Sequence, residues 1–200
     1  MNIAVFASGR GTNLQAIIDA VKAGKVKANI ACVIGDRKDA FALERARRAG
    51  IEAIYIRSKD FSSCEEFDRE AIRHLERHNV ELVVLAGFMR LLSGYFVNKY
   101  RNRIMNIHPA LLPSFKGTEG IKDAWDYGVK VTGPSVHFVT EDLDAGPIIL
   151  QNPVAIEEDD TMETLEEKIH KAEHEIYPEA IRLFVEGKLK VEGRKVKILD

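Results

Sequence analysis

The stretch NIAVFASGRGTNLQAII, residues 2–18, begins with an apolar run typical of a strand, passes two glycines and continues with apolar residues at helical spacing. Further apolar runs lie at 29–34, 51–56, 81–86 and 103–107, and helical patterns separate them. Runs such as ELVVLA (81–86) are continuously apolar, as expected of central parallel strands that helices cover on both faces. The sequence therefore predicts an α/β fold with one doubly wound, mostly parallel sheet.

The second half of the chain predicts an antiparallel edge to this sheet. Residues 131–141 and 146–156 have strand-like composition, and a turn lies between them. A long helical pattern follows over 161–186, and Pro178 is expected to bend or restart it because proline cannot donate a helical hydrogen bond. The last residues predict a short hairpin with its turn at Glu192-Gly193.

Length and composition limit the possible functions. Two hundred residues suit a single domain over 1–200. The 29 basic and 31 acidic residues give a formal charge of −2, which offers no electrostatic footprint for nucleic acid or for an anionic membrane. No leader or membrane-length segment is recognisable, so we expect a cytoplasmic protein with small-molecule partners. Cys32 and Cys64 are too few for a disulfide framework or a cysteine metal cluster.

Residues 8–13, SGRGTN, form a glycine loop between the first strand and its helix. Two glycines allow a tight turn whose N–H groups approach an anion, and Thr12 or Asn13 can cap the positive end of the helix. This pattern favours a phosphate site. A dinucleotide loop needs a third glycine where Leu14 stands, and a nucleoside-triphosphate loop needs a lysine that is absent. The alternative is a simple strand-to-helix turn.

Asn106 and His108 lie at the end of the strand predicted over 103–107. Side chains two apart in a strand share a face, and Pro109 restricts His108 to an extended backbone. An amide donor beside an imidazole suits acyl transfer, in which a carbonyl oxygen gains negative charge. No G-x-S-x-G elbow or nearby cysteine offers a covalent nucleophile, so direct attack by a substrate amine is favoured. The alternative for His108 is a structural residue with satisfied hydrogen bonds.

Asp142 and Asp144 lie in the turn between the two antiparallel strands. A carboxylate close to His108 would raise the imidazole pKa, or orient a water that removes the proton from the attacking amine. We expect Asp144 to have this role. The alternatives are solvated turn carboxylates or a weak metal site with His108, and no ligand spacing supports the metal.

A set of motifs carries a resemblance to a known family. They are S-G-x-G-T-N at 8–13, LAGFMR at 85–90, NIHPALLP at 106–113, VHFV with LDAGPI within 136–148, and E-H-x-I-Y-P at 173–178. With them the chain resembles, over essentially its full length, the phosphoribosylglycinamide formyltransferase family of purine synthesis. The resemblance implies a formyltransferase fold with a Rossmann-like N-terminal half, 10-formyltetrahydrofolate as cosubstrate, glycinamide ribonucleotide as substrate, no metal, and a monomer or homodimer.

The resemblance also implies roles for individual residues. Asn106, His108 and Asp144 would be catalytic. The residues implied to bind glycinamide ribonucleotide are Gly11, Thr12, Asn13, His170 and Glu173. Those implied to bind the folate are Met89, Arg90, Leu91, Leu92, Asn106, Thr140, Glu141, Asp142, Leu143 and Asp144. Residues 1–100 would form the nucleotide-phosphate-binding half and 101–200 the catalytic and folate-binding half.

The sequence departs from the pattern of some relatives at two places. Cys64 stands where some relatives carry a basic residue associated with the glutamate tail of the folate, and the loop SFKGTEG (114–120) lacks the proline and histidines of some relatives. A formyltetrahydrofolate hydrolase usually carries a further domain, which disfavours that alternative. A dinucleotide-binding oxidoreductase or sensor would use the glycine loop and Asp36, and the missing third glycine argues against it.

Overall fold

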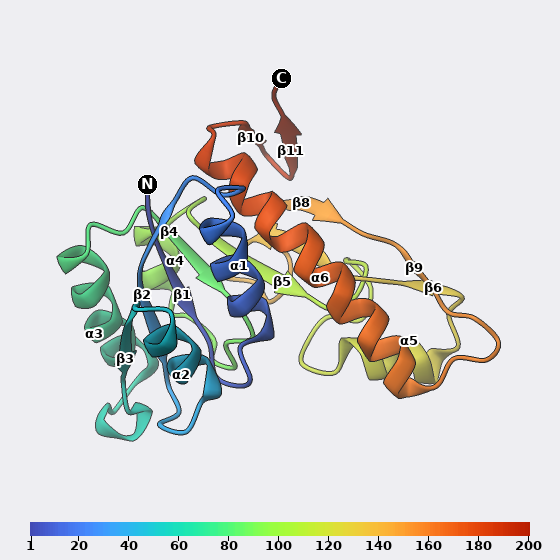
Figure 1. The fold of residues 1–200 in the computed structure, drawn as a ribbon, viewed down its shortest axis with the longest axis horizontal. Helices are drawn as coiled ribbons and strands as arrows, with labels where there is room; N and C mark the ends of the chain where they lie inside the picture. The colour runs from blue at the N-terminus through green and yellow to red at the C-terminus, as the bar shows by residue number, and fades with distance from the viewer. The chain divides into compact units, whose positions relative to one another are not determined.

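The computed structural model describes residues 1–200 and consists of two compact units, Met1–Met105 and Asn106–Asp200. Figure 1 shows the first unit in blue to green and the second in yellow-green to red. Strand β5 (Ile104–His108) carries the chain from the first unit into the second.

The first unit contains four parallel strands in the order β4-β1-β2-β3. Their bounds are Asn2–Phe6 for β1, Asn29–Gly35 for β2, Glu52–Tyr55 for β3 and Leu82–Leu85 for β4. All of β4, and all of β1 after its first residue, is buried, as their continuously apolar composition predicts.

Helices connect these strands and cover both faces of the parallel sheet. They are α1 (Thr12–Lys22), α2 (Phe41–Arg48), the short 3₁₀ helix η1 (Ser58–Asp60), α3 (Cys64–Arg77) and α4 (Gly94–Lys99). The chain adds β2 and β3 on one side of β1 and then returns to add β4 on the other. Because such crossovers are right-handed, α1 and α2 pack together on one face and α3 and α4 on the other. The strand order reverses between β1 and β4, where doubly wound sheets bind their ligands.

The second unit contains antiparallel strand pairs. Strand β7 (Ser135–Phe138) pairs antiparallel with β8 (Ile148–Gln151), and β8 contacts β11 (Lys195–Ile198), which forms a hairpin with β10 (Leu189–Glu192). Strands β6 (Val131–Thr132) and β9 (Val154–Ala155) form a separate small sheet. The helices are α5 (Gly120–Tyr127) and α6 (Met162–Val185). The predicted mostly parallel α/β fold with an antiparallel edge is confirmed.

Helix α6 does not restart at Pro178, which was one of the two predicted effects of that proline. It begins with reciprocal hydrogen bonds between Thr161 and Thr164, a capping box. It then continues through Pro178 to Val185 without a restart. A proline removes only one backbone donor, and buried neighbours on the same face, such as Ile181, stabilise the helix across that position.

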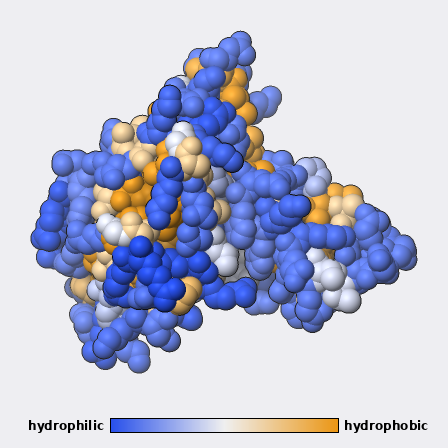
Figure 2. Space-filling view, viewed as in Figure 1, coloured by the Kyte–Doolittle hydropathy of each residue, from blue (hydrophilic) through white to orange (hydrophobic).

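The surface is mostly hydrophilic in Figure 2, with hydrophobic side chains visible on the C-terminal hairpin, where Ile198 and the following Leu199 are exposed. No helix among residues 1–200 combines the length and the apolar composition that crossing a membrane requires.

Candidate active site

Strand β5 ends with the two polar residues that the sequence singles out. Asn106 and His108 project from the same side of the strand, while Ile107 between them is buried. The His108 side chain is almost completely removed from solvent, with 3% of its surface exposed. The backbone therefore presents an amide and an imidazole side by side.

Asp144 meets both of these residues in the second unit. Its Oδ2 atom lies 3.5 Å from Nδ1 of His108, and its Oδ1 atom accepts a long hydrogen bond of 3.5 Å from Nδ2 of Asn106. Asp144 is buried and has a positive φ of 46°, a backbone conformation that aspartate tolerates better than most residues. The three predicted catalytic side chains thus form one cluster, and their catalytic role stays a prediction.

His137 on β7 is a fourth member of this cluster that sequence reasoning assigned no role. Its Nε2 atom lies 3.2 Å from Nδ2 of Asn106 and 3.5 Å from Oδ1 of Asp144. Its Nδ1 atom lies 2.9 Å from the carbonyl oxygen of Phe138, which can only accept, so Nδ1 carries a proton. In the sequence His137 stands between apolar residues of a strand, a pattern that indicates a core position as readily as a functional one.

The loop after β5 closes over His108 and Asp144. The carbonyl oxygen of Phe115 lies 2.7 Å from Nε2 of His108, and the Gly117 amide donates to Oδ2 of Asp144 at 3.0 Å. Both loop residues have positive φ, 51° for Phe115 and 106° for Gly117. Gly120 packs against the imidazole, where a Cβ atom would lie 3.1 Å from Nε2. The loop therefore engages polar atoms of both His108 and Asp144.

Burial and hydrogen bonding shift the pKa values of His108 and Asp144 in opposite directions. Burial lowers the pKa of His108 below its ordinary value, although the Asp144 carboxylate and the Phe115 carbonyl act to raise it. The predicted influence of Asp144 is present, but desolvation outweighs it. Burial acts to raise the pKa of Asp144, yet the hydrogen bonds from His137 and the Gly117 amide, together with the nearby imidazoles, lower it.

A buried hydrogen-bond network holds the turn that follows His108. The Ser135 hydroxyl donates to the carbonyl of Ala110 at 2.7 Å and accepts from the Leu112 amide at 3.0 Å. The Gln151 side chain donates to the same hydroxyl at 2.8 Å and to the Leu112 carbonyl at 3.0 Å. The backbone after His108 is therefore held by hydrogen bonds from side chains of β7 and β8, in addition to the restriction that Pro109 and Pro113 impose.

The glycine loop in the first unit differs in its capping from the prediction. Helix α1 begins at Thr12, and its cap is Gly11 with φ 71° and no side-chain hydrogen bond. The expectation that Thr12 or Asn13 caps the helix is therefore wrong. The left-handed conformation of Gly11 starts the helix earlier and places both residues in its first turn. The N–H groups in the first turn of a helix have no acceptor within the helix, which is what an anion site at a helix start uses.

Ser8 connects this loop to the segment predicted to bind folate. Its amide donates to the Gly87 carbonyl at 3.0 Å, and its hydroxyl accepts from the Met89 amide at 2.9 Å. Ser8 itself is almost fully buried. The ends of β1 and β4 are thus joined at the point where the strand order reverses.

The two segments predicted to bind folate carry exposed apolar side chains. Met89 and Leu91 of the first unit are 61% and 68% exposed, and Leu143 of the second is 52% exposed. Arg90 stacks on Phe67, with its guanidinium carbon 4.5 Å from the ring centroid. Leu92 is half-buried, and Thr140 donates to the carbonyl of Asp142 at 3.3 Å. Exposed large apolar residues are typical of a surface that a ligand covers.

Helix α6 carries the remaining predicted residues. Glu173 is buried on the face of the helix that also buries Ile169 and Tyr177, with 5% of its surface exposed, whereas His170 is half-buried. The sequence context alone indicates a partly exposed carboxylate at this position, whereas the structure buries Glu173.

Comparison with known proteins relates the chain to formyl transferases. The sequence model of the formyl transferase family matches residues 1–181. The chain is 46% identical over 191 residues to the phosphoribosylglycinamide formyltransferase of Escherichia coli (strain K12), covering 96% of this chain and 90% of that protein. Its fold matches the crystal structure of glycinamide ribonucleotide transformylase 1 from Symbiobacterium toebii with a TM-score of 0.98 and 51% identity, over 100% of this chain and 94% of that one.

A formyltetrahydrofolate deformylase from Pseudomonas syringae shares the fold with a TM-score of 0.92, but it is only 27% identical and the chain covers 66% of it. The higher identity and nearly complete coverage of the transferases favour the predicted transferase over the hydrolase. The prediction from the motifs is thereby confirmed, and the chain belongs to the formyl transferase family.

Proposed function

We propose that the chain transfers the formyl group of 10-formyltetrahydrofolate to the amine of 5-phosphoribosylglycinamide, giving N-formylglycinamide ribonucleotide and tetrahydrofolate in purine biosynthesis. The observation that carries the proposal is that the Asp144 carboxylate lies 3.5 Å from Nδ2 of Asn106 and 3.5 Å from Nδ1 of His108. The phosphoribosylglycinamide formyltransferase of Escherichia coli (strain K12), which is 46% identical over 191 residues, supports the choice of substrates.

In this mechanism Asn106 and His108 stabilise the negative charge that develops on the formyl oxygen. The amine attacks the formyl carbon directly, and Nδ2 of Asn106 and Nε2 of His108 donate hydrogen bonds to that oxygen. One such donor contributes about 3 kcal/mol to the transition state in other enzymes. Because the Phe115 carbonyl lies 2.7 Å from Nε2, the formyl oxygen has to displace it.

In the same mechanism Asp144 accepts the proton that the attacking amine loses. The attacking amine loses a proton as the new C–N bond forms, and Asp144 receives it through a water molecule. The proton then passes to the folate nitrogen, whose bond to the formyl carbon breaks, so that no proton or electron is left over. The lowered pKa of Asp144 keeps its carboxylate ionised and ready to accept.

The remaining predicted residues bind the substrates. Gly11, Thr12 and Asn13 hold the phosphate at the uncapped start of α1, and His170 and Glu173 contact the glycinamide or ribose part. Met89 to Leu92 and Thr140 to Asp144 bind the folate, whose flat ring covers exposed apolar side chains. In this proposal residues 1–200 act as one domain, with a phosphate-binding first half and a catalytic second half.

The test is a formyl-transfer assay in which each substrate is omitted in turn, with no metal or ATP added. Formylated nucleotide is expected only when both substrates are present. Loss of formyl without the nucleotide would identify a hydrolase, and quenching of NADH fluorescence on titration would identify a dinucleotide-binding protein.

Two variants test the assigned mechanism. His108→Ala and Asp144→Asn are each expected to lower turnover by about a hundredfold, since positioned acid–base groups contribute roughly 10²–10⁴-fold. The circular dichroism spectrum and the urea unfolding midpoint of each variant serve as the control for folding. Undiminished turnover in both variants would remove the mechanism and leave the family assignment intact.

A further inference from the structure

Helix α2 contacts the backbone of the glycine loop at three successive residues. The Ala42 amide donates to the carbonyl of Gly9 at 3.1 Å, and Nε of Arg45 donates to the carbonyl of Arg10 at 2.8 Å. At the third residue, Gly11, an added Cβ atom would lie 2.7 Å from Cβ of Ala42. The loop therefore lies directly against α2.

These contacts determine the direction in which the loop amides point. The only cis peptide bond among residues 1–200 precedes Pro113, so the loop peptides are trans, and the C=O and N–H of each unit point in opposite directions. Holding the Gly9 carbonyl toward α2 directs the Arg10 N–H away from it. Holding the Arg10 carbonyl in the same way directs the Gly11 N–H away as well. Successive N–H groups on one side of the backbone form an anion-binding concavity.

The start of α1 continues this arrangement. The Gly11 carbonyl accepts from the Gln15 amide at 2.9 Å, the first hydrogen bond of the helix. The peptide that follows therefore directs the Thr12 N–H out of the end of the helix. The N–H groups of Arg10, Gly11 and Thr12 are therefore each directed away from the group that holds the preceding carbonyl.

Arg45 is itself held in place by two further contacts. Its Nη1 atom donates to Oε1 of Gln15 at 3.1 Å, and its guanidinium carbon lies 4.8 Å from the centroid of the Phe41 ring. Gln15 is fixed in turn by a hydrogen bond of 2.9 Å to Asp19. A planar guanidinium with several donors suits such a bridge between two helices and a backbone carbonyl.

We propose that Arg45 is a positioning residue for the phosphate of the nucleotide. By holding the Arg10 carbonyl toward α2, it keeps the Gly11 N–H directed at the phosphate, and Ala42 does the same for the preceding peptide. Arg45 acts through the backbone, since its Nε donor is used by the Arg10 carbonyl. The inference rests on the proposed function, because the anion is the 5-phosphate of glycinamide ribonucleotide.

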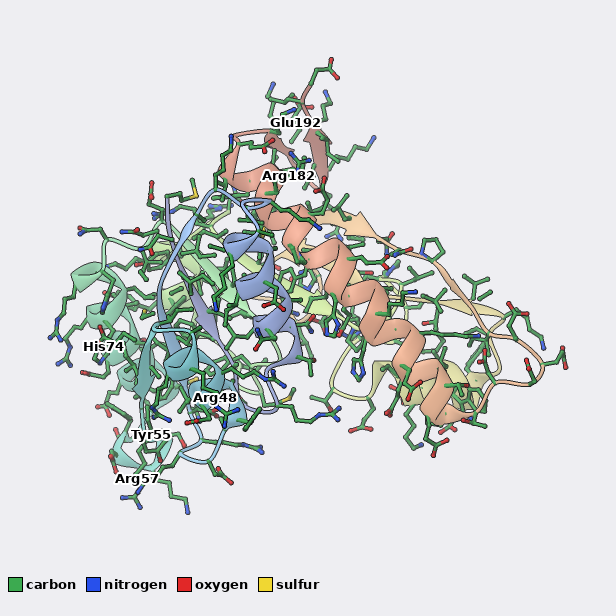
Figure 3. All side chains as sticks on the ribbon, viewed as in Figure 1. Arg48, Tyr55, Arg57, His74, Arg182 and Glu192 are labelled. Carbon is green, nitrogen blue, oxygen red and sulfur yellow. The ribbon has the colours of Figure 1, made fainter.

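Arg48 provides a matched control on the same helix. Its guanidinium carbon also lies over the Phe41 ring, 5.5 Å from the centroid, but its Nε atom donates to Glu44 at 3.0 Å instead of to the loop. Figure 3 labels Arg48 on α2. The substitution Arg48→Gln removes the same charge and the same type of ring contact as Arg45→Gln, and it leaves the loop contact unchanged.

The kinetic experiment compares wild type, Arg45→Gln and Arg48→Gln with the nucleotide and with its dephosphorylated nucleoside. Arg45→Gln is expected to raise KM for the nucleotide about tenfold, the effect of one well-placed hydrogen bond. The kcat, the KM for the folate and the kcat/KM for the nucleoside are expected to stay within about twofold, the range of surface substitutions. Arg48→Gln is expected to match wild type in all of these.

The binding experiment is independent of turnover. In ¹⁵N–¹H spectra of the wild type, the Gly11 amide is expected to shift on titration with inorganic phosphate. Arg45→Gln is expected to weaken this response and Arg48→Gln to retain it. If wild type binds phosphate at Gly11 but forms no product, the proposed function fails and the positioning role of Arg45 still holds.

Several outcomes would overturn the inference. They are an unchanged nucleotide KM and phosphate response in Arg45→Gln, equal losses in the two arginine variants, or equal losses with nucleotide and nucleoside. Should Arg45→Gln fail to fold, Gln15→Ala removes only the support of Nη1 and is expected to raise the nucleotide KM to a smaller extent. An unchanged KM and phosphate response in that variant would count against the inference.

Discussion

Nε2 of His108 lies 2.7 Å from the carbonyl oxygen of Phe115, seven residues further along the chain. The carbonyl can only accept a hydrogen bond, so the imidazole has its proton on Nε2. Burial lowers the pKa of His108, which favours the neutral ring. Near pH 7.5 we therefore expect a neutral His108 protonated on Nε2. Nitrogen-15 NMR of the histidine rings, with His108→Ala to assign the signal, measures this directly, and a proton on Nδ1 alone would contradict it.

The lowered pKa of His108 also predicts how stability depends on pH. The unfolded chain has a histidine pKa of about 6.5, so it binds a proton more readily than the folded protein does. Stability is expected to fall as the pH drops from about 6.5 through the lowered folded-state pKa. Urea unfolding of wild type and His108→Gln across this range isolates the contribution, because the other histidines are common to both. The difference between the two curves should change with pH, and parallel curves would refute the assignment.

Two buried hydroxyls of the second unit predict opposite effects of removal. Ser135→Ala leaves the Leu112 amide and the Ala110 carbonyl without their partner and is expected to cost about 1–3 kcal/mol of unfolding free energy. It should also lower kcat, because the turn behind His108 loosens. Thr132 has a buried hydroxyl with no hydrogen-bond partner, so Thr132→Val is expected to be neutral or stabilising. Denaturant titration of both variants checks this, and equal destabilisation would show that the Ser135 network contributes nothing specific.

The two glycines of the loop predict different tolerance to a side chain. Gly11→Ala would place a Cβ atom 2.7 Å from Cβ and 2.8 Å from Cα of Ala42, at a positive φ that costs a further 1–2 kcal/mol or so. We expect the loop to shift to relieve this strain, and KM for the nucleotide to rise about tenfold because a displaced Gly11 N–H loses its proposed hydrogen bond to the phosphate. Gly9→Ala meets no atom within 4 Å and should leave KM close to wild type. A comparable loss in the two variants would show that loop flexibility, and not the Ala42 contact, is what matters.

Much of the first unit could be predicted because its signals are local. Continuous apolar runs indicate the buried parallel strands, and the glycine pattern locates the first loop. The position of the cap of α1 could not be predicted, because it depends on the backbone conformation of Gly11 more than on the capping preferences of Thr12 and Asn13.

The sequence predicts which residues form the candidate site, but it does not predict the direction in which the pKa of His108 shifts. Asn106, His108 and Asp144 were found from residue type, spacing and family motifs, and the structure brings them together. The net effect on His108 depends on how deeply folding buries it, which a sequence does not state. The contribution of His137 could not be found because a histidine between apolar strand residues has no distinguishing pattern.

The hydroxyl of Ser8 accepts a hydrogen bond from the Met89 amide, 81 positions away along the chain. Any displacement of the glycine loop is therefore transmitted to the start of the segment after β4, and the reverse holds as well. A mutational scan would register Ser8 as intolerant although its side chain is buried, and its sensitivity would reflect the hydrogen bond between two segments that we propose to bind different ligands.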